Sequence, residues 1–357
     1  MTPSHLPRPF PVDSDPVQVA VIGLGYWGPN LVRNFHEGAD AEVVAVCDLD
    51  ESALAGVARR YPALRTTTSY DDVLADEEVE AVAIATPIST HHALALAALE
   101  AGKHVFVEKP LAASPREAAE VVERARAAGL TLMPGHTFVY SPPVNKTRDL
   151  IRHGDLGEVY FVTMSRVNLG LHQPDVSVVW DLGPHDFSIL RYWLDELPSR
   201  VWALSRSCIF PGTPDVAFIG LEFPSGTIAH VELSWLAPSK LRRTAIVGSE
   251  KMVVYDDTSN EPVRVFDAGA ALPNPETFGE YRLSYRTGDI VSPHIEVTEP
   301  LSLELQDFCR AIRTGEEPRS SAQLGLDVVT VIDAVDRSLA LGGVPVDVET
   351  RVQDLRS

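Results

Sequence analysis

The sequence is poor in basic residues, in cysteine and in long apolar segments. Lysine and arginine number 30 against 50 aspartate and glutamate residues in a chain of 357, so the formal net charge is −20. A protein with this charge repels polyanions, which argues against nucleic acid or an anionic membrane as its main partner. No apolar run approaches the roughly 20 residues that a membrane-spanning helix needs. A small molecule is therefore the expected ligand.

Three cysteines, Cys47, Cys208 and Cys309, lie far apart in the sequence and are odd in number. They imply neither a disulfide framework nor a CxxC metal site, and we expect no metal. A reducing, cytoplasmic location fits this cysteine usage best. Residues 1–16 contain five prolines and no apolar block, so they do not have the pattern of a secretory signal, and we expect them to form a flexible tail.

Short apolar strands alternate with helices in the first part of the chain. The pattern predicts strands at 17–22, 41–48, 79–85, 104–107 and 130–133, with helices of about 10–15 residues between most of them. This alternation is typical of a doubly wound parallel sheet with right-handed crossovers. We therefore predict an α/β protein whose first domain covers residues 17–134.

After residue 134 the predicted strands follow one another with few helices between them. They lie at 158–167, 215–223, 226–236 and 244–255, and they are rich in Val, Ile and aromatic residues. This pattern favours a mostly antiparallel sheet. Residues 273–293 have the composition of a loop, and amphipathic helices are predicted at 301–313 and 322–341. Residues 135–357 are therefore expected to form an α+β domain.

A glycine turn gives the strongest local signal. It follows the first strand directly, opens a helix, and is followed by a second strand that ends in Asp48. This context is the fingerprint of a Rossmann dinucleotide-binding domain, in which glycines admit a pyrophosphate to the helix N-terminus and the acid binds the ribose hydroxyls. Because a carboxylate repels a 2′-phosphate, we prefer NAD over NADP. The alternative is that the glycines only form a tight turn. The candidate cofactor ligands here are Gly23, Gly25, Tyr26, Trp27, Gly28 and Asp48.

The segment from His104 to Pro110 is a second candidate. Three apolar residues predict a buried strand, which ends at once in Glu108 and Lys109. Ligands of open parallel sheets bind beyond the carboxyl ends of the strands, so Lys109 is expected where cofactor and substrate meet. Pro110 restricts the backbone of Lys109. The alternative is a solvated charge pair before a turn; otherwise Glu108 has a supporting role, touching the cofactor or orienting Lys109.

The loop after the preceding strand is expected to lie under the nicotinamide half of the cofactor. It contributes Thr86, Pro87 and His91 as candidate cofactor contacts. A metal site at His91 and His92 is the alternative, but adjacent histidines point apart on a helix, and we do not favour it.

A third candidate lies in the second domain, in the run from Trp180 to Phe187. Asp181 and His185 are four residues apart, which places them on one face of a helix. A histidine that titrates near neutral pH can take a proton from a hydroxyl as hydride leaves the carbon, and Asp181 could raise its basicity. The alternative is that Asp181 caps the helix and His185 packs in the core. Asp186 is expected to cap the first turn.

Other polar residues could line a substrate site, although packing or a structural salt bridge is the alternative for each. They are His136, Tyr140, Arg166, Asn168 and His172.

These motifs together resemble the Gfo/Idh/MocA oxidoreductases, over nearly all of residues 17–345. The resemblance rests on GLGYWG, Asp48, the loop from Ala85 to His92, AGKHVFVEKP and DLGPHD. It implies a Rossmann domain followed by an α/β domain with a large, open, mostly antiparallel sheet, and hydride transfer between NAD(P) and a secondary alcohol. In that comparison Lys109 orients and polarises the substrate hydroxyl, His185 is the acid/base with Asp181 beside it, and Lys109-Pro110 is a cis peptide.

Within the family, two segments resemble a branch that oxidises C3 of nucleotide sugars of the UDP-N-acetylglucosamine type. They are VIGLGYWGPNLVRNF and VNLGLHQPDVSVVWDLGPHD. The resemblance implies that the substrate is a pyranose within a nucleotide sugar. The alternatives are an inositol or free-sugar dehydrogenase and, from another functional class, a non-catalytic NAD-binding sensor. We also expect a homodimer or homotetramer that associates through the open sheet.

Overall fold

The computed structural model describes residues 14–170, 176–271 and 284–349. The chain divides into two compact units. Unit 1 contains the residues up to Ser141, Thr298–Asp333 and the chain from Glu349, whereas unit 2 contains Pro142–Val297 and Ala334–Val348. Most of the predicted tail, part of the predicted loop at 273–293, and His172 lie outside the described residues.

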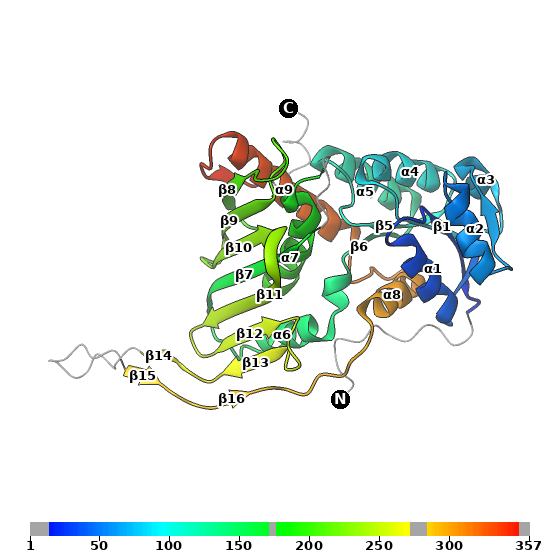
Figure 1. The fold of residues 1–357 in the computed structure, drawn as a ribbon. Coiled ribbons are helices and arrows are strands. Elements are labelled where there is room, and N and C mark those ends of the chain that lie inside the picture. The colour runs from blue at the N-terminus through cyan, green and yellow to red at the C-terminus, as the bar shows by residue number, and fades with distance from the viewer. Residues whose placement is uncertain (1–13, 171–175, 272–283, 350–357) are drawn as a thin grey trace. The chain divides into compact units, whose positions relative to one another are not determined.

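Unit 1 is built on a six-stranded parallel sheet of order β3-β2-β1-β4-β5-β6 (Figure 1). This is the predicted doubly wound sheet. The order reverses between β1 and β4, and ligands of such sheets bind beyond the carboxyl ends of the strands at that point. The strands are β1 (Val17–Ile22), β2 (Ala41–Cys47), β3 (Arg65–Thr67), β4 (Ala81–Ile84), β5 (His104–Glu108) and β6 (Leu132–Gly135).

Helices cover both faces of this sheet because its central strands are apolar on both sides. All four residues of β4 are buried, and so are Val105, Phe106 and Val107 on β5. α4 and α5 pack together on one face, while α1 packs against α8 on the other (Figure 1). The helices of unit 1 are α1 (Gly28–Glu37), α2 (Glu51–Arg60), α3 (Tyr70–Ala75), α4 (Ile88–Glu100), α5 (Pro115–Ala128), the 3₁₀ turn η1 (Thr137–Tyr140), α8 (Pro300–Thr314) and the first part of α9 (Ala322–Ala340).

Helix α8 comes from the part of the chain that we assigned to the second domain. Its side chains Leu305 and Phe308 are buried, and the Phe308 ring meets Phe106 of β5 edge-on at a centroid distance of 5.8 Å. The structure therefore places residues 298–333 in unit 1, unlike the predicted boundary. An amphipathic pattern predicts that a helix covers an apolar surface, but it does not tell which one.

Unit 2 is built on a nine-stranded sheet of order β16-β13-β12-β11-β7-β10-β9-β8-β17. Strands β7 and β10 run parallel, and the other neighbouring pairs are antiparallel, which confirms the predicted fold class. The strands are β7 (Val159–Leu169), β8 (Arg200–Arg206), β9 (Val216–Glu222), β10 (Ile228–Ser234), β11 (Leu236–Gly248), β12 (Met252–Asp256), β13 (Val263–Phe266), β16 (Ile290–Val291) and β17 (Val346–Asp347); β14 (Gly269–Ala271) and β15 (Ser284–Arg286) form a separate pair.

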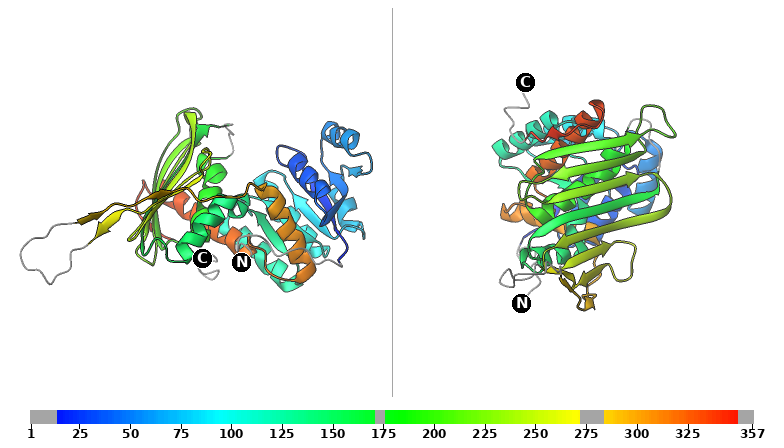
Figure 2. Two further views of the ribbon diagram at one scale, coloured as in Figure 1. Left: turned by 90° about the horizontal axis from the view of Figure 1, so that it is seen from below. Right: turned by 90° about the vertical axis from the view of Figure 1, so that its left-hand side faces the viewer.

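One face of the nine-stranded sheet packs against α6 (Pro142–Arg152) and α7 (Val178–Leu194). Along β7 the side chains alternate, so that Val162 and Met164 are buried on this face while Phe161 is exposed on the other. The right-hand view of Figure 2 shows that other face, over which no helix of the described ranges passes. None of the helices in those ranges is long and apolar enough to cross a membrane.

Candidate cofactor and substrate site

The glycine turn between β1 and α1 depends on two of its glycines for its shape. Gly23 has a φ of +89°, in the left-handed region, and its N–H donates to the carbonyl oxygen of Cys47 at 2.8 Å. A Cβ atom on Gly28 would lie 2.0 Å from the carbonyl oxygen of Gly23, so only glycine allows α1 to start against the turn. A Cβ on Gly25 would meet nothing within 4 Å. The surface at Gly25 is thus open to a ligand that approaches the backbone closely.

The carboxylate of Asp48 is held under this turn. Its Oδ2 accepts from the N–H of Leu24 at 2.5 Å, and its Oδ1 accepts from the N–H of Asp50 at 2.8 Å. A carboxylate has about four lone-pair sites, so two remain for the hydroxyls of a ribose. Three large side chains in the loops after β1 and β2 are exposed: the exposed fractions of Tyr26, Trp27 and Leu49 are 76%, 40% and 90%. Leu49 was missed in the sequence because a single apolar residue in a loop gives no periodic signal.

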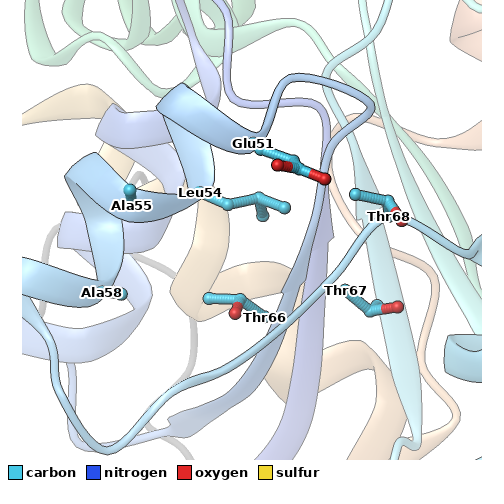
Figure 3. A pocket seen from close by; sticks show the side chains of 7 residues that line it. All are labelled: Glu51, Leu54, Ala55, Ala58, Thr66, Thr67 and Thr68. Atoms are coloured by element: carbon cyan, nitrogen blue, oxygen red, sulfur yellow. The ribbon is translucent and has the colours of Figure 1, made fainter.

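A surface pocket of about 470 Å³ lies between α2 and β3, next to the end of β2 (Figure 3). Four side chains of α2 form one wall and three threonines form the other: Glu51, Leu54, Ala55 and Ala58 face Thr66, Thr67 and Thr68. The lining contains one carboxylate and no cation. The lining of this pocket therefore offers no positive side chain to a phosphate.

The loops that follow β4 and β5 are joined by His91. Its Nδ1 lies 2.8 Å from the carbonyl oxygen of Pro110, and its Nε2 lies 2.9 Å from the carbonyl oxygen of Thr86. The ring is 1% exposed, so it fixes these loops from within. We predicted His91 as a contact of the cofactor, but both of its nitrogens face the protein backbone. The peptide bond between Lys109 and Pro110 is cis, as the family resemblance implied.

Three buried ionisable side chains of unit 1 interact electrostatically with Lys109 or with Glu108. Burial raises the pKa of Glu108 to about 7, although the charge of Lys109 acts in the opposite direction. Burial, and then the charge of Lys109, lower the pKa of His136 to about 3. Burial raises the pKa of Glu304 well above its usual value, and the charge of Glu108 raises it further. At neutral pH the structure thus holds His136 without charge, and the burial of Glu304 favours its protonated form.

Glu304 was missed in the sequence analysis. It lies on α8, is 0% exposed, and its Oε2 accepts from the hydroxyl of Thr137 at 2.7 Å. Its Oε1, and both ring nitrogens of His136, have no hydrogen-bond partner among the described residues. A Cβ on Gly135 would lie 3.2 Å from Oε2 of Glu108, so the backbone of β6 packs directly on that carboxylate.

Tyr140, which we predicted to contact the substrate, is a structural residue. It is 0% exposed, its hydroxyl donates to Oδ2 of Asp307 at 2.8 Å, and the same oxygen accepts from the N–H of Ser320 at 3.0 Å. The hydroxyl is thus occupied within unit 1. Asp307 also accepts from the guanidinium of Arg310 at 2.8 Å.

In unit 2, helix α7 carries Asp181 and His185. The N-cap is Ser177, whose hydroxyl accepts from the N–H of Trp180 at 3.4 Å, so Asp181 lies in the first turn and does not cap it. Oδ2 of Asp181 accepts from Nε1 of Trp235 at 3.0 Å. Both Asp181 and His185 are half-buried, and one turn of helix separates them.

Arg166 and Asp186 form a buried ion pair, which corrects two predictions. The guanidinium donates to both carboxylate oxygens at 2.8–3.0 Å, and the side chains are 4% and 3% exposed. Asp186 is therefore not a helix cap, and the carboxylate of Asp186 holds the Arg166 side chain that we predicted to bind substrate. Asn168 is half-buried on β7, and no group of side chains in the described ranges could hold a metal ion.

Two family models match the chain. "Oxidoreductase family, NAD-binding Rossmann fold" matches residues 17–136, and "GFO/IDH/MocA C-terminal domain" matches residues 144–254, so that together they cover more than half of the sequence. The chain belongs to the Gfo/Idh/MocA oxidoreductases. The predicted family, fold and NAD cofactor are confirmed.

Proteins that are similar along nearly the whole chain include two named dehydrogenases and one solved structure. D-xylose 1-dehydrogenase (NADP(+)) 2 of Haloferax volcanii is 29% identical, with 90% of this chain and 97% of that protein covered. The NAD(+)-dependent scyllo-inositol 2-dehydrogenase of Bacillus subtilis is 27% identical, with 89% and 90% covered. The crystal structure of GenD2 from gentamicin A biosynthesis, in complex with NAD, has a TM-score of 0.81 at 25% identity, with 97% and 99% covered.

Proposed function

We propose that this protein oxidises a secondary alcohol on the ring of a cyclitol or free sugar, with NAD as the hydride acceptor. The observation that carries the proposal is the position of Lys109 at the carboxyl end of β5, directly after the buried Glu108 and beside the loop after β4. In a parallel sheet that binds a dinucleotide, this is where the nicotinamide and the substrate meet.

The preference for NAD over NADP rests on the surroundings of Asp48. Its carboxylate is fixed by two backbone N–H groups, and the pocket beside α2 adds Glu51 and no basic residue. A 2′-phosphate placed there would face two negative charges without a counter-ion. The similar xylose dehydrogenase has NADP(+) in its name, so a comparison of the two cofactors is a direct test of this reasoning.

The proposed reaction assigns separate roles to three side chains. When bound, NAD supplies the acceptor for the hydride of the alcohol carbon. Lys109 donates a hydrogen bond to the substrate oxygen and polarises its O–H bond. His185 takes the hydroxyl proton as the C–H bond breaks, which leaves a ketone. Asp181, one helical turn before His185, accepts from the indole N–H of Trp235, and its role in the proposal is to orient His185.

The proposed substrate class is supported by relatives that are named as dehydrogenases of inositol and of a free sugar. A nucleotide sugar oxidised at C3 is the second candidate, and it is supported by the segment at residues 167–186. The purified protein with NAD should be tested against inositols, free sugars and nucleotide sugars, with NADH absorbance as the readout. Turnover of nucleotide sugars alone would favour the second candidate.

Alanine variants test the assigned roles. Lys109→Ala and His185→Ala should each lower turnover by roughly 10²–10⁴-fold, while NAD binding measured by calorimetry persists. Normal turnover by either variant would contradict the mechanism. If the wild-type protein binds NAD but oxidises nothing in the panel, a sensor function becomes the better explanation.

The exposed face of the nine-stranded sheet suggests a second copy of the chain as a partner. Phe161, Phe218 and Ile228, on three adjacent strands, are 39%, 46% and 53% exposed. Apolar side chains gathered on one sheet face are typical of an interface. Analytical ultracentrifugation at micromolar concentration should show a dimer or tetramer, and a Phe218→Asp variant should dissociate it. A monomeric wild-type protein would contradict this proposal.

A further inference from the structure

The ring of His91 faces two acceptors at once. Thr86 and Pro110 both present backbone carbonyl oxygens to it, at 2.9 Å from Nε2 and 2.8 Å from Nδ1. A neutral imidazole has one N–H donor and one acceptor nitrogen, so it can donate to only one carbonyl. A histidine placed between two carbonyls therefore holds one loop by a hydrogen bond and the other by close packing, unless it carries a second proton.

The second proton is disfavoured where His91 lies. Burial lowers the pKa of His91, and the charge of Lys109 lowers it further, whereas the two carbonyls act against this change. Among the described residues, the charged group that acts on the His91 ring is Lys109, on the loop after β5. The ring is therefore neutral at neutral pH, and the choice between two tautomers decides which loop receives the hydrogen bond.

The two loops are the ones that the proposed function places around the nicotinamide. Thr86 follows β4, and Pro110 follows Lys109 at the end of β5. The other half of the cofactor has its own site at the glycine turn and Asp48, and no hydrogen bond of His91 reaches that site. The loop after β4 also packs on Gly23 of that turn. A defect in the spacing of the two loops should therefore weaken binding of the nicotinamide half more than binding of the other half.

We propose that His91 is a positioning residue, which holds the loops after β4 and β5 at the spacing that the nicotinamide half of the cofactor requires. The inference rests on the proposed placement of the nicotinamide, but not on any alcohol substrate. It assigns to His91 a role inside the protein in place of direct contact with the cofactor.

Binding of NAD, NADH and ADP-ribose to the intact chain separates the two halves of the cofactor. ADP-ribose lacks the nicotinamide, so its affinity reports on the glycine turn and on correct folding. In His91→Phe, which keeps a planar ring without nitrogens, NAD and NADH affinity should fall by about tenfold. ADP-ribose affinity should stay within about twofold of that of the wild-type protein.

Two further variants complete the test. His91→Gln retains one donor group and should recover part of the lost NAD affinity. His92→Phe is the matched control, because His92 is the next residue of α4, and its Nε2 contacts Glu120 on α5 at 3.0 Å instead of either loop. It should bind all three ligands like the wild-type protein.

The proposal is overturned if His91→Gln and His91→Phe bind NAD with unchanged affinity, or if ADP-ribose binding weakens in His91→Gln as much as NAD binding. The latter result would mean that His91 only supports the fold. Because no sugar is present in these measurements, a failure to find turnover would leave the outcome unaffected.

Discussion

Replacing Glu108 by glutamine should make the protein more stable at alkaline pH. The pKa of Glu108 is raised from 4.5 to about 7, mainly by burial. In the unfolded chain this carboxyl ionises near its usual pKa, whereas the folded protein resists its ionisation up to about pH 7. The stability that Glu108 contributes is therefore complete below pH 4.5 and is lost as pH rises towards 7. Each unit of pKa corresponds to about 1.4 kcal/mol, so the loss is about 3 kcal/mol.

Glu108→Gln has the shape of the protonated acid and keeps an oxygen that can accept from the N–H of Lys109. Urea unfolding of the cofactor-free protein should give nearly equal free energies for wild type and variant at pH 4.5, with the variant more stable by about 3 kcal/mol at pH 8. Glu123→Gln is the control, because it removes the same charge from an exposed position on α5. A difference between Glu108→Gln and wild type that does not change with pH would refute the reasoning.

The charge of Glu108 also acts on Glu304, so the two effects should be coupled. Glu304→Gln alone should likewise stabilise the protein at high pH, because it removes a carboxyl whose pKa burial raises. The double variant should gain less than the sum of the single variants, since each removes part of the repulsion that the other feels. Additive gains in the free energy of unfolding at pH 8 would contradict an electrostatic interaction between these two carboxyl groups.

Other predictions follow from the packing of single residues. Gly25→Ala should fold normally but lose NAD affinity by at least about tenfold, whereas Gly28→Ala should also lower the melting temperature, because its Cβ would overlap a backbone carbonyl. Calorimetry and thermal denaturation would separate the two effects, and equal losses of stability would contradict them. Arg166→Met should lower the free energy of unfolding in urea by about 3–5 kcal/mol, because it leaves the charge of Asp186 buried and unpaired. Adding Asp186→Leu should restore much of this loss, and a double variant that is no more stable than Arg166→Met would disprove this cause. Tyr140→Phe should cost about 1–3 kcal/mol of stability, because the buried N–H of Ser320 loses its acceptor and Asp307 loses one of its donors, while NAD affinity stays unchanged.

Where the chemistry is local in sequence, the prediction was sound. The glycine turn, the strand before it and Asp48 lie within one supersecondary unit, and the structure gives Gly23 and Gly28 the backbone roles that the motif indicates. The parallel sheet was predictable for the same reason, since each strand–helix pair is a short periodic pattern. The NAD cofactor followed from this one unit.

Where the partner is distant in sequence, the prediction failed. Arg166 was predicted to bind substrate because nothing in its own strand indicates that Asp186 on α7 neutralises it. Glu304 lies between two leucines of an amphipathic helix, where a glutamate is usually at the solvent boundary, yet it is fully buried. Tyr140 is likewise occupied by Asp307 on the same distant helix. Burial and pairing of this kind are properties of tertiary packing.

The two hydrogen bonds of Asp48 have a consequence for changing the cofactor. The same carboxylate that would bind the ribose also fastens Leu24 of the glycine turn and Asp50 at the start of α2. Replacing Asp48 by a basic residue that could bind a 2′-phosphate would also remove the hydrogen bonds to both backbone segments. The same side chain therefore determines both the preference for NAD and the conformation of the glycine turn. A switch to NADP would need a second substitution that returns an acceptor to the turn before any gain from the new cation could be seen.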